Sequence, residues 1–397
     1  MRAATALLVG GFISWGGCAK DSSMATRWPS VEELPERDDL PDPFVMRDGS
    51  RVRTREDWRR RRQEIAAMLA HYEYGHMPPP PGNVRAKDVS TQPFMQGKAI
   101  LRRVVLEMGP EHKARMNVGI YLPANADRRV PVLMAVEPVW QEHLRPIAEL
   151  AVKRGYGLAG YERHDLDPDD ADRSNGVHPL YPDYDWATLA VWAWGAMRLV
   201  DYLVTLPEVD GERLALTGHS RAGKTALLAG ALDERIALVA PHGSGAGGAG
   251  SYRIVGKKGE SLRGITHPKR FHFWFHPRLR DFAGKEKRLP FDQHFLRALV
   301  APRCVVSLDG FADYWANPLG TQQTWRATQP VYDFLGASDK NVLYFRPGGH
   351  DTTVEDWKVL LDYCDHFLLS KPLGEIETRL PFPDAKKPFR WRPPAKQ

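Results

Sequence analysis

The stretch Leu214-Ala-Leu-Thr-Gly-His-Ser-Arg-Ala-Gly-Lys-Thr-Ala-Leu-Leu-Ala229 decides the fold. An apolar, strand-like run ends at Thr217, Ser220 stands in a turn of small residues, and a helix-forming run follows at once. A serine between a strand and a helix has its hydroxyl exposed above the edge of the sheet. The stretch therefore predicts a nucleophilic serine on a sheet of alternating strands and helices.

The same stretch allows two other interpretations. A serine in this position also serves as an ordinary helix N-cap. The letters Gly218 to Thr225 also fit the phosphate-loop pattern Gly-x-x-x-x-Gly-Lys-Ser/Thr. A phosphate loop follows the first strand of its sheet, whereas at least four predicted strands precede this one. The nucleophile is favoured, although Ala222 stands where the esterase motif usually has its second glycine and Gly223 follows it.

The remaining chain alternates between strand-like and helix-like runs, which is typical of an α/β protein with a mostly parallel central sheet and helices on both faces. Strands are predicted at 99–107 and 116–122 (an antiparallel pair), 130–136, 155–160, 213–217, 236–240, 304–308 and 341–345. Helices are predicted at 56–73, 144–154, 186–206, 222–231, 321–335 and 354–369. Residues 243–300 interrupt the pattern and are predicted to be an insertion after the strand that follows the nucleophile.

The continuous alternation of strands and helices indicates one large catalytic domain over residues 56–375, between a polar lead-in at 18–55 and a polar tail at 376–397, although the length alone would also fit two or three domains. The 397 residues are 43% hydrophobic and 26% charged, as in an ordinary globular enzyme. The net charge of +6 is spread over short basic runs with acidic neighbours, which argues against nucleic-acid binding.

Cysteine and histidine usage predicts neither a metal nor another cofactor. Three cysteines are too few for a disulfide-stapled scaffold or a four-cysteine zinc site, and the 14 histidines lack ligand spacing. Cys304 and Cys364 lie in a strand-like and a helix-like run, so buried thiols are expected, with a disulfide between them left open.

The N-terminus is typical of an export signal. Met1-Arg2 is followed by an apolar run of small residues to Gly17. This run is too short to span a membrane as a permanent transmembrane helix. Gly16-Gly17-Cys18 resembles a bacterial lipoprotein signal, in which the cysteine becomes the lipidated first residue. We therefore predict a signal peptide at 1–17 and a periplasmic or surface lipoprotein anchored through Cys18. Plain secretion, with Cys18 incidental, is the alternative.

A serine nucleophile needs a base and an orienting acid, which follow it in the order acid, then histidine. His350 lies in a glycine-rich loop directly after the last predicted strand, where a base can reach over the sheet edge. The loop after the preceding strand carries both Asp309 and Asp313, and position alone leaves both open as the acid. Asp351 is adjacent to His350 and cannot readily turn to its far ring nitrogen.

Several motifs occur in one specific order: NGVHPL from Asn175, GHSRAGKTAL from Gly218, SGAGGAGSYR from Ser244, DYWANP from Asp313 and GGHDTTVEDW from Gly348. Over residues 40–370 the chain resembles the bacterial branch of the glucuronoyl esterases, carbohydrate esterase family 15. The resemblance implies an α/β-hydrolase fold. It also implies hydrolysis of the ester between glucuronic acid of xylan and lignin alcohols, a step in lignocellulose degradation.

The resemblance implies roles for individual residues. Ser220 would be the nucleophile, His350 the base, and Arg221 would help to hold the oxyanion. Asp313 matches the bacterial Asp-x-Trp element and would be the acid. Contacts to the sugar are implied for four residues: Lys224 and Trp315, and, within the insertion, Glu260 and Trp274.

The sequence departs from the family pattern at two positions. Gly243 stands where many members have a glutamate, so the acid must come from the later loop. His219 replaces the cysteine of fungal members, which removes a disulfide found there and suggests a divergent branch. The exact ester therefore stays open.

Nothing in a serine–histidine–aspartate set selects the alcohol, the acyl group or an amine. Another serine hydrolase, such as an acetyl (xylan) esterase or a peptidase, is an alternative, as is a non-catalytic carbohydrate-binding relative. The expected partner is a glucuronoxylan or lignin–carbohydrate ester, and a monomer is expected.

Overall fold

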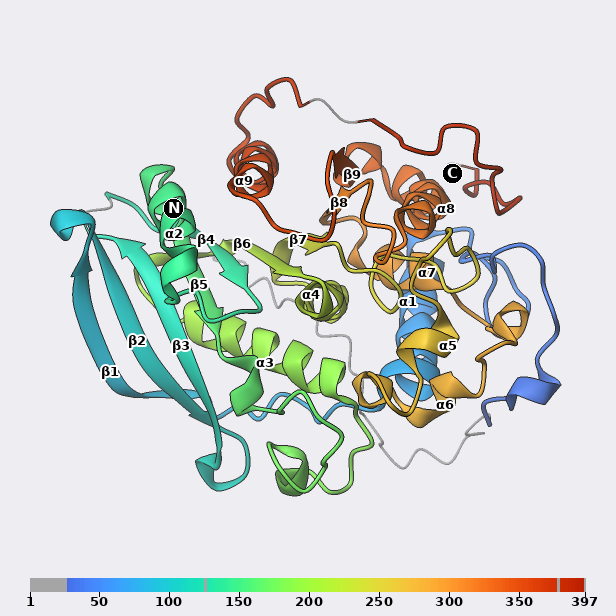
Figure 1. Ribbon diagram of the computed structural model, residues 1–397, viewed down its shortest axis with the longest axis horizontal. Coiled ribbons are helices and arrows are strands. Elements are labelled where there is room, and N and C mark those ends of the chain that lie inside the picture. The colour runs from blue at the N-terminus through green and yellow to red at the C-terminus, as the bar shows by residue number, and fades with distance from the viewer. Residues whose placement is uncertain (1–26, 125–126, 377–378, 396–397) are drawn as a thin grey trace, which may run out of the picture.

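The computed structural model of the protein describes residues 27–124, 127–376 and 379–395. A nine-stranded sheet in the order β1-β2-β3-β5-β4-β6-β7-β8-β9 forms its centre (Figure 1). The first four strands in this order pair antiparallel, and β5-β4-β6-β7-β8-β9 pair parallel. The strands are β1 Arg85–Phe94, β2 Ala99–Met108, β3 Ala114–Pro123, β4 Val130–Ala135, β5 Gly157–Tyr161, β6 Val209–His219, β7 Ile236–His242, β8 Cys304–Gly310 and β9 Asn341–Arg346.

Helices cover both faces of the sheet, so the predicted architecture is confirmed. One face packs against α2 and α9, and the other against α3, α4 and α7, with α1 and α8 beside them. The helices are α1 Arg55–Leu69, α2 Arg145–Lys153, α3 Thr188–Leu203, α4 Arg221–Leu232, α5 Leu262–Ile265, α6 Pro277–Arg280, α7 Gln293–Val300, α8 Pro318–Leu335 and α9 Val354–Leu369.

Local sequence explains where these elements begin and end. All six residues of β4 are buried, as expected of a near-continuous apolar run in a parallel sheet. Helices α1 and α9 each begin with a capping box, formed by Thr54 with Asp57 and by Thr353 with Asp356. The strand β1 was not predicted, because nine of its ten residues are exposed and show no apolar alternation.

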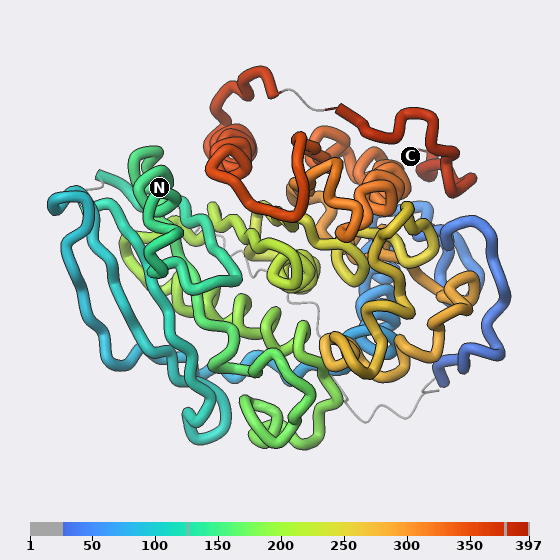
Figure 2. Tube along the Cα trace, viewed as in Figure 1, coloured from blue at the N-terminus to red at the C-terminus, as the bar shows by residue number. Residues whose placement is uncertain are grey.

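Both ends of the described chain pack against the catalytic domain. The prediction of a polar lead-in and a polar tail did not foresee this packing. Phe44 of the N-terminal segment is fully buried, and Trp391 of the C-terminal segment is 7% exposed. The two segments run along the same side of the molecule (Figure 2), where the Leu40 backbone N–H donates to the Pro388 carbonyl at 2.9 Å. The few apolar residues of these segments are thus part of the core, although most residues of the segments are polar.

The segment between β7 and β8 contains α5, α6 and α7 joined by irregular chain. It covers the carboxyl end of the sheet beside α4 (Figure 1). Cys304 and Cys364 are both buried free thiols. The predicted signal peptide and Cys18 lie outside the described residues. Within the described ranges, no helix combines the length and apolarity needed to cross a membrane.

Candidate active site

Ser220 occupies the sharp turn between β6 and α4. Its φ of 57° and ψ of −121° are a strained combination for a residue with a side chain, and such strain concentrates at functional sites. Its backbone N–H donates to the His242 carbonyl at 2.8 Å, and its carbonyl accepts the Gly223 N–H at 2.9 Å. These bonds hold the turn while the hydroxyl stays outside the helix.

Three predicted residues meet at this turn. The Ser220 hydroxyl lies 3.0 Å from Nε2 of His350, and Nδ1 of His350 lies 2.6 Å from Oδ2 of Asp313. With Nδ1 protonated and donating to the carboxylate, Nε2 is left to accept the serine proton. Asp313 is 4% exposed, and its Oδ1 accepts the Ala316 backbone N–H at 3.1 Å, which fixes the carboxylate orientation.

Asp309, the other candidate acid, does not contact His350. It is 1% exposed, and neither of its carboxylate oxygens has a hydrogen-bond partner. Burial, with Asp313 nearby, raises the pKa of Asp309 to about 8. Because burial disfavours the charged carboxylate, the neutral form of Asp309 is favoured at pH 7. Neither aspartate caps the helix that follows, because the N-cap of α8 is Asn317, whose Oδ1 accepts the Gly320 N–H at 3.1 Å.

Two further histidines extend from His350 as a chain of ring contacts. The ring of His219 is 4.6 Å from that of His350 and 5.2 Å from that of His242. Burial and the neighbouring His350 lower the pKa of His219 to about 4, and burial lowers the pKa of His242 well below its usual value. Both rings are therefore neutral at pH 7, so they surround His350 without adding charge.

Arg221, the first residue of α4, is held by a side chain that the sequence did not single out. Asp169, from the acidic loop after β5, forms an ion pair with Arg221 and accepts the indole N–H of Trp274 at 2.7 Å. The guanidinium lies 4.8 Å from the Trp274 ring centroid. Arg221 is thus fixed one residue after Ser220, between a carboxylate and an aromatic face.

Lys224 is buried, and its three ammonium protons are engaged. Nζ donates to the carbonyls of Ser244 and Ala246 at 2.7 and 2.5 Å and to Oε2 of Glu260 at 2.8 Å. Lys224 and Glu260, two of the residues implied in sugar contact, thus form a buried ion pair with each other. An ammonium has three donors, so a sugar hydroxyl would have to displace one of these partners.

The two tryptophans implied in sugar binding differ in exposure. Trp315 is 39% exposed, and the Arg270 guanidinium lies 5.0 Å from its ring centroid. Trp274 is only 2% exposed and stacks on Phe271 at 4.1 Å. Arg253 pairs with Asp292 at 3.4 Å. Within the described ranges, no cluster of three metal-binding side chains occurs.

Comparison with known proteins places this chain in a family. A family model described as fungal glucuronyl esterase matches residues 107–336. Carbohydrate esterase MZ0003, from an unknown prokaryotic organism, is 33% identical over 390 residues, which cover 83% of this chain and 89% of that protein. The chain belongs to the glucuronoyl esterases, carbohydrate esterase family 15.

Both fungal and bacterial members of the glucuronoyl esterase family are similar to this chain. A 4-O-methyl-glucuronoyl methylesterase of Podospora anserina is 31% identical, with 87% of this chain and 71% of that protein covered. A solved glucuronoyl esterase of Caldicellulosiruptor kristjansonii is 33% identical, with a TM-score of 0.72 over 86% of this chain and 93% of that one. A promiscuous family member from a marine bacterial metagenome has a TM-score of 0.73 at 32% identity, over 85% and 99% of the two chains. The predicted α/β-hydrolase fold is confirmed.

The surroundings of Gly243 explain why this glucuronoyl esterase has no glutamate at that position. Gly243 has a φ of +50°, and a Cβ there would lie 3.4 Å from both Oδ2 of Asp313 and Nε2 of His219. A glutamate at 243 would therefore enter the space beside Asp313. Two carboxylates so close would repel each other, so Gly243 suits a site whose acid comes from the β8 loop.

Proposed function

We propose that this chain is a serine carboxylic ester hydrolase that cleaves glucuronoyl esters by an acyl-enzyme mechanism. The observation that carries the proposal is the hydrogen-bonded chain from Ser220 through His350 to Asp313. The substrate class comes from family membership, since relatives covering most of the chain are named 4-O-methyl-glucuronoyl methylesterases.

In the first half of the reaction, Oγ of Ser220 attacks the ester carbonyl while Nε2 of His350 takes its proton. Asp313 stabilises the imidazolium that forms. His350 then donates the proton to the departing alcohol oxygen, and the glucuronoyl group remains on Ser220. Water repeats the sequence with the same base and releases the uronic acid.

The tetrahedral intermediate carries an oxyanion that needs donors placed beforehand. Arg221 is proposed to supply them through its backbone N–H and its guanidinium. The ion pair with Asp169 supports this role, because it restrains the long side chain before substrate arrives.

Glu260 and Trp315 are proposed to contact the sugar, with Trp274 behind them. Trp315 is partly exposed, and its carbonyl accepts the Glu260 backbone N–H at 2.8 Å, which ties the two together. Lys224 is proposed to act mainly by holding Glu260 and the 244–246 loop, because its own donors are engaged.

The test compares hydrolysis of a methyl 4-O-methyl-glucuronate ester with hydrolysis of acetylated xylan and of a peptide ester. We expect preference for the glucuronate, and a Ser220→Ala variant that folds like wild type but loses about 10⁶-fold in rate. Preferred cleavage of the acetyl ester or peptide would favour the alternative hydrolases. Loss of less than tenfold in Ser220→Ala would place the nucleophile elsewhere.

We also propose that the protein is exported and anchored in a membrane through a lipid on Cys18. Met1-Arg2, the apolar run that follows and Gly16-Gly17-Cys18 support this proposal. An extracellular or periplasmic place suits an enzyme whose polymeric substrate cannot enter the cell.

A further inference from the structure

The proposed base His350 lies in a loop that hydrophobic packing does not hold. Residues 347–353 join β9 to α9, and Pro347, Gly348 and His350 are all exposed. Two adjacent glycines, Gly348 and Gly349, precede the histidine and would leave an unsupported backbone free to adopt many conformations. Catalysis nevertheless needs the imidazole at fixed distances from two partners. Polar contacts must therefore hold this loop.

The Arg346 guanidinium supplies such contacts. Arg346 is the last residue of β9 and is 7% exposed. Its Nη1 donates to the Pro347 carbonyl at 2.8 Å, and its Nη2 donates to the carbonyls of Asp351 and, at 3.5 Å, of Gly349. These carbonyls belong to the first residue of the loop and to the residues directly before and after His350. One rigid planar group thus contacts the loop backbone on both sides of the base.

Gly348 shows how closely the guanidinium approaches the loop. A Cβ at this position would lie 2.5 Å from Nη1 of Arg346, and Gly348 has a φ of +107°. Both features require glycine. The Gly348 carbonyl also accepts the Ala312 backbone N–H at 3.0 Å, in the segment that leads to Asp313. The same turn therefore contacts Arg346 and the loop of the acid.

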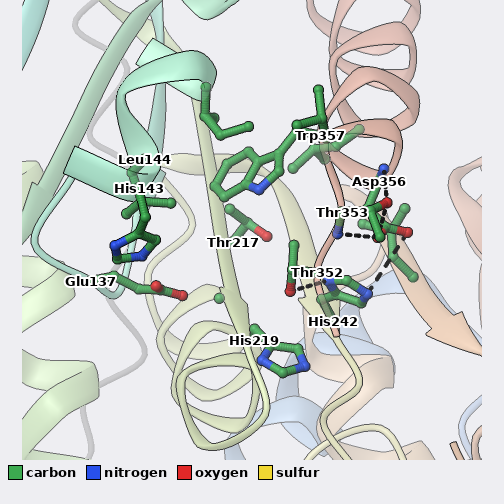
Figure 3. A pocket seen from close by; sticks show the side chains of 15 residues that line it. Glu137, His143, Leu144, Thr217, His219, His242, Thr352, Thr353, Asp356 and Trp357 are labelled. Atoms are coloured by element: carbon green, nitrogen blue, oxygen red, sulfur yellow. Dashed lines mark hydrogen bonds and ion pairs between the residues drawn. The ribbon is translucent and has the colours of Figure 1, made fainter. Parts of the chain in front are cut away.

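Asp356, in the first turn of α9, fixes the guanidinium. It is 2% exposed, and both of its carboxylate oxygens lie 2.9 Å from Nε of Arg346. Figure 3 shows Thr353 beside Asp356, where Oδ2 accepts the backbone N–H and the hydroxyl of Thr353 at 2.7 and 2.8 Å. Hydrogen bonds to a charged group are the stronger ones. The start of α9 is thus tied to the end of β9, with the loop between them.

His242 connects this ion pair to the turn of the nucleophile. Its Nδ1 lies 3.1 Å from the Thr352 hydroxyl, and its Nε2 lies 3.9 Å from Oδ1 of Asp356 (Figure 3). The His242 backbone carbonyl accepts the Ser220 N–H at 2.8 Å. The turn of Ser220 and the loop of His350 therefore have a support in common.

We propose that Arg346 and Asp356 are positioning residues for His350. Their ion pair holds the loop so that the imidazole keeps its contacts with Ser220 at 3.0 Å and Asp313 at 2.6 Å. Both residues act through the loop and not on the substrate. This inference rests on the proposed serine esterase mechanism and adds the residues that set its geometry. A misplacement of about 1 Å can lower a rate about 10²-fold.

The first test is the Arg346→Lys variant of the full chain. A lysine ammonium keeps a positive charge for Asp356, but it lacks the planar fork that contacts the carbonyls on both sides of His350. We expect kcat about 10²-fold lower on a methyl glucuronate ester, with KM within about twofold of the wild-type value. Hydrolysis of 4-nitrophenyl acetate should also lose kcat, because the same base serves either ester.

The double variant Arg346→Gln with Asp356→Asn keeps the proposal testable if the single variant does not fold. Removing one partner of a buried ion pair leaves an uncompensated charge, whereas removing both avoids that penalty. The double variant also lacks the fork, so the same loss of kcat is expected in the folded protein.

Arg235→Lys is the matched control. Arg235 forms an ion pair with Asp233 at 2.6 Å, directly before β7 and thus at the end of the strands opposite to the catalytic loops. Thermal unfolding should show a loss of stability similar to that of Arg346→Lys, while kcat stays unchanged.

A spectroscopic signal reports the position of His350 directly. A proton on Nδ1 that is shared with a carboxylate at 2.6 Å resonates far downfield in ¹H NMR. We expect this resonance in the wild type and in Arg235→Lys, and its shift or loss in the Arg346 variants. A residue needed only for stability would leave the resonance of the folded protein unchanged.

Full kcat together with an unchanged downfield resonance in the folded Arg346 variants would overturn the positioning role, while the esterase function stands. An equal loss of kcat in Arg235→Lys would also overturn it, because the effect would then be one of stability. Wild-type protein that cleaves neither ester would overturn the proposed function itself, and the positioning role with it.

Discussion

Asp313→Asn and Asp309→Asn form a matched pair that separates the orienting acid from its buried neighbour. In the Asp313 variant, the amide oxygen is expected to keep the bond now made by Oδ1, which accepts the Ala316 N–H at 3.1 Å. The NH₂ group then faces Nδ1 of His350, where the carboxylate lies at 2.6 Å. A donor there forces the imidazole proton to Nε2, and the Ser220 hydroxyl loses its base.

The size of the effect follows from this change of tautomer. In a serine protease the corresponding exchange lowers kcat about 10⁴-fold, or about 5 kcal/mol of barrier. We expect a similar loss for Asp313→Asn. Asp309→Asn should change kcat less than threefold, because that side chain is neutral at pH 7 and makes no bond to His350.

The assay is kcat on a methyl glucuronate ester at pH 7, with thermal unfolding showing that both variants fold. The reasoning is refuted if Asp313→Asn keeps more than a tenth of the activity, or if Asp309→Asn loses as much as Asp313→Asn.

Three further outcomes are expected. Because the pKa of Asp309 is raised to about 8, its ionisation costs stability as pH rises from about 4 to 8. The melting temperature of Asp309→Asn relative to wild type should therefore climb over that window and level off above it; a difference independent of pH would contradict the buried carboxyl. Lys224→Met should cost about 3 to 5 kcal/mol of unfolding free energy in urea, and adding Glu260→Gln should recover part of it; equal stability of single and double variants would exclude the pair. Cys18→Ser should move the exported protein from the membrane to the soluble fraction on cell fractionation, whereas soluble export of the native protein would leave only secretion.

The parallel half of the fold was predictable because its strands are buried on both faces. Apolar runs such as the one in β4 mark these strands, and the linking helices follow at regular spacing. β1 was missed because it is exposed at the sheet edge, where neither periodicity nor apolarity is required. Phe44 and Trp391 were missed as core residues because each stands among polar neighbours, and only the folded chain brings them together with the body.

The sequence predicts the candidate site residues only to the extent that it predicts where the strands end. Position after a strand indicated Ser220 and His350, but it could not choose between Asp309 and Asp313, because the strand predicted at 304–308 ends before both. In the structure Asp309 belongs to β8 and only Asp313 lies in the loop after it, so the choice depends on where the strand ends. The contact between Asp169 and Arg221 had a weak signal, the five aspartates between positions 165 and 172, but nothing in the spacing tells which of them faces α4.

The imperfect esterase motif shows how a letter pattern differs from the physical requirement behind it. A Cβ on Gly218 would lie 2.4 Å from the Ala222 carbonyl oxygen, so the first glycine is needed for the turn to close. A Cβ on Gly223 would lie 2.8 Å from the Gly218 carbonyl oxygen and 2.9 Å from that of His242. The second close approach, between α4 and the strands β6 and β7, therefore falls at 223. Ala222 is tolerated because the turn requires a glycine where the backbones meet, and in this chain that place is one residue later.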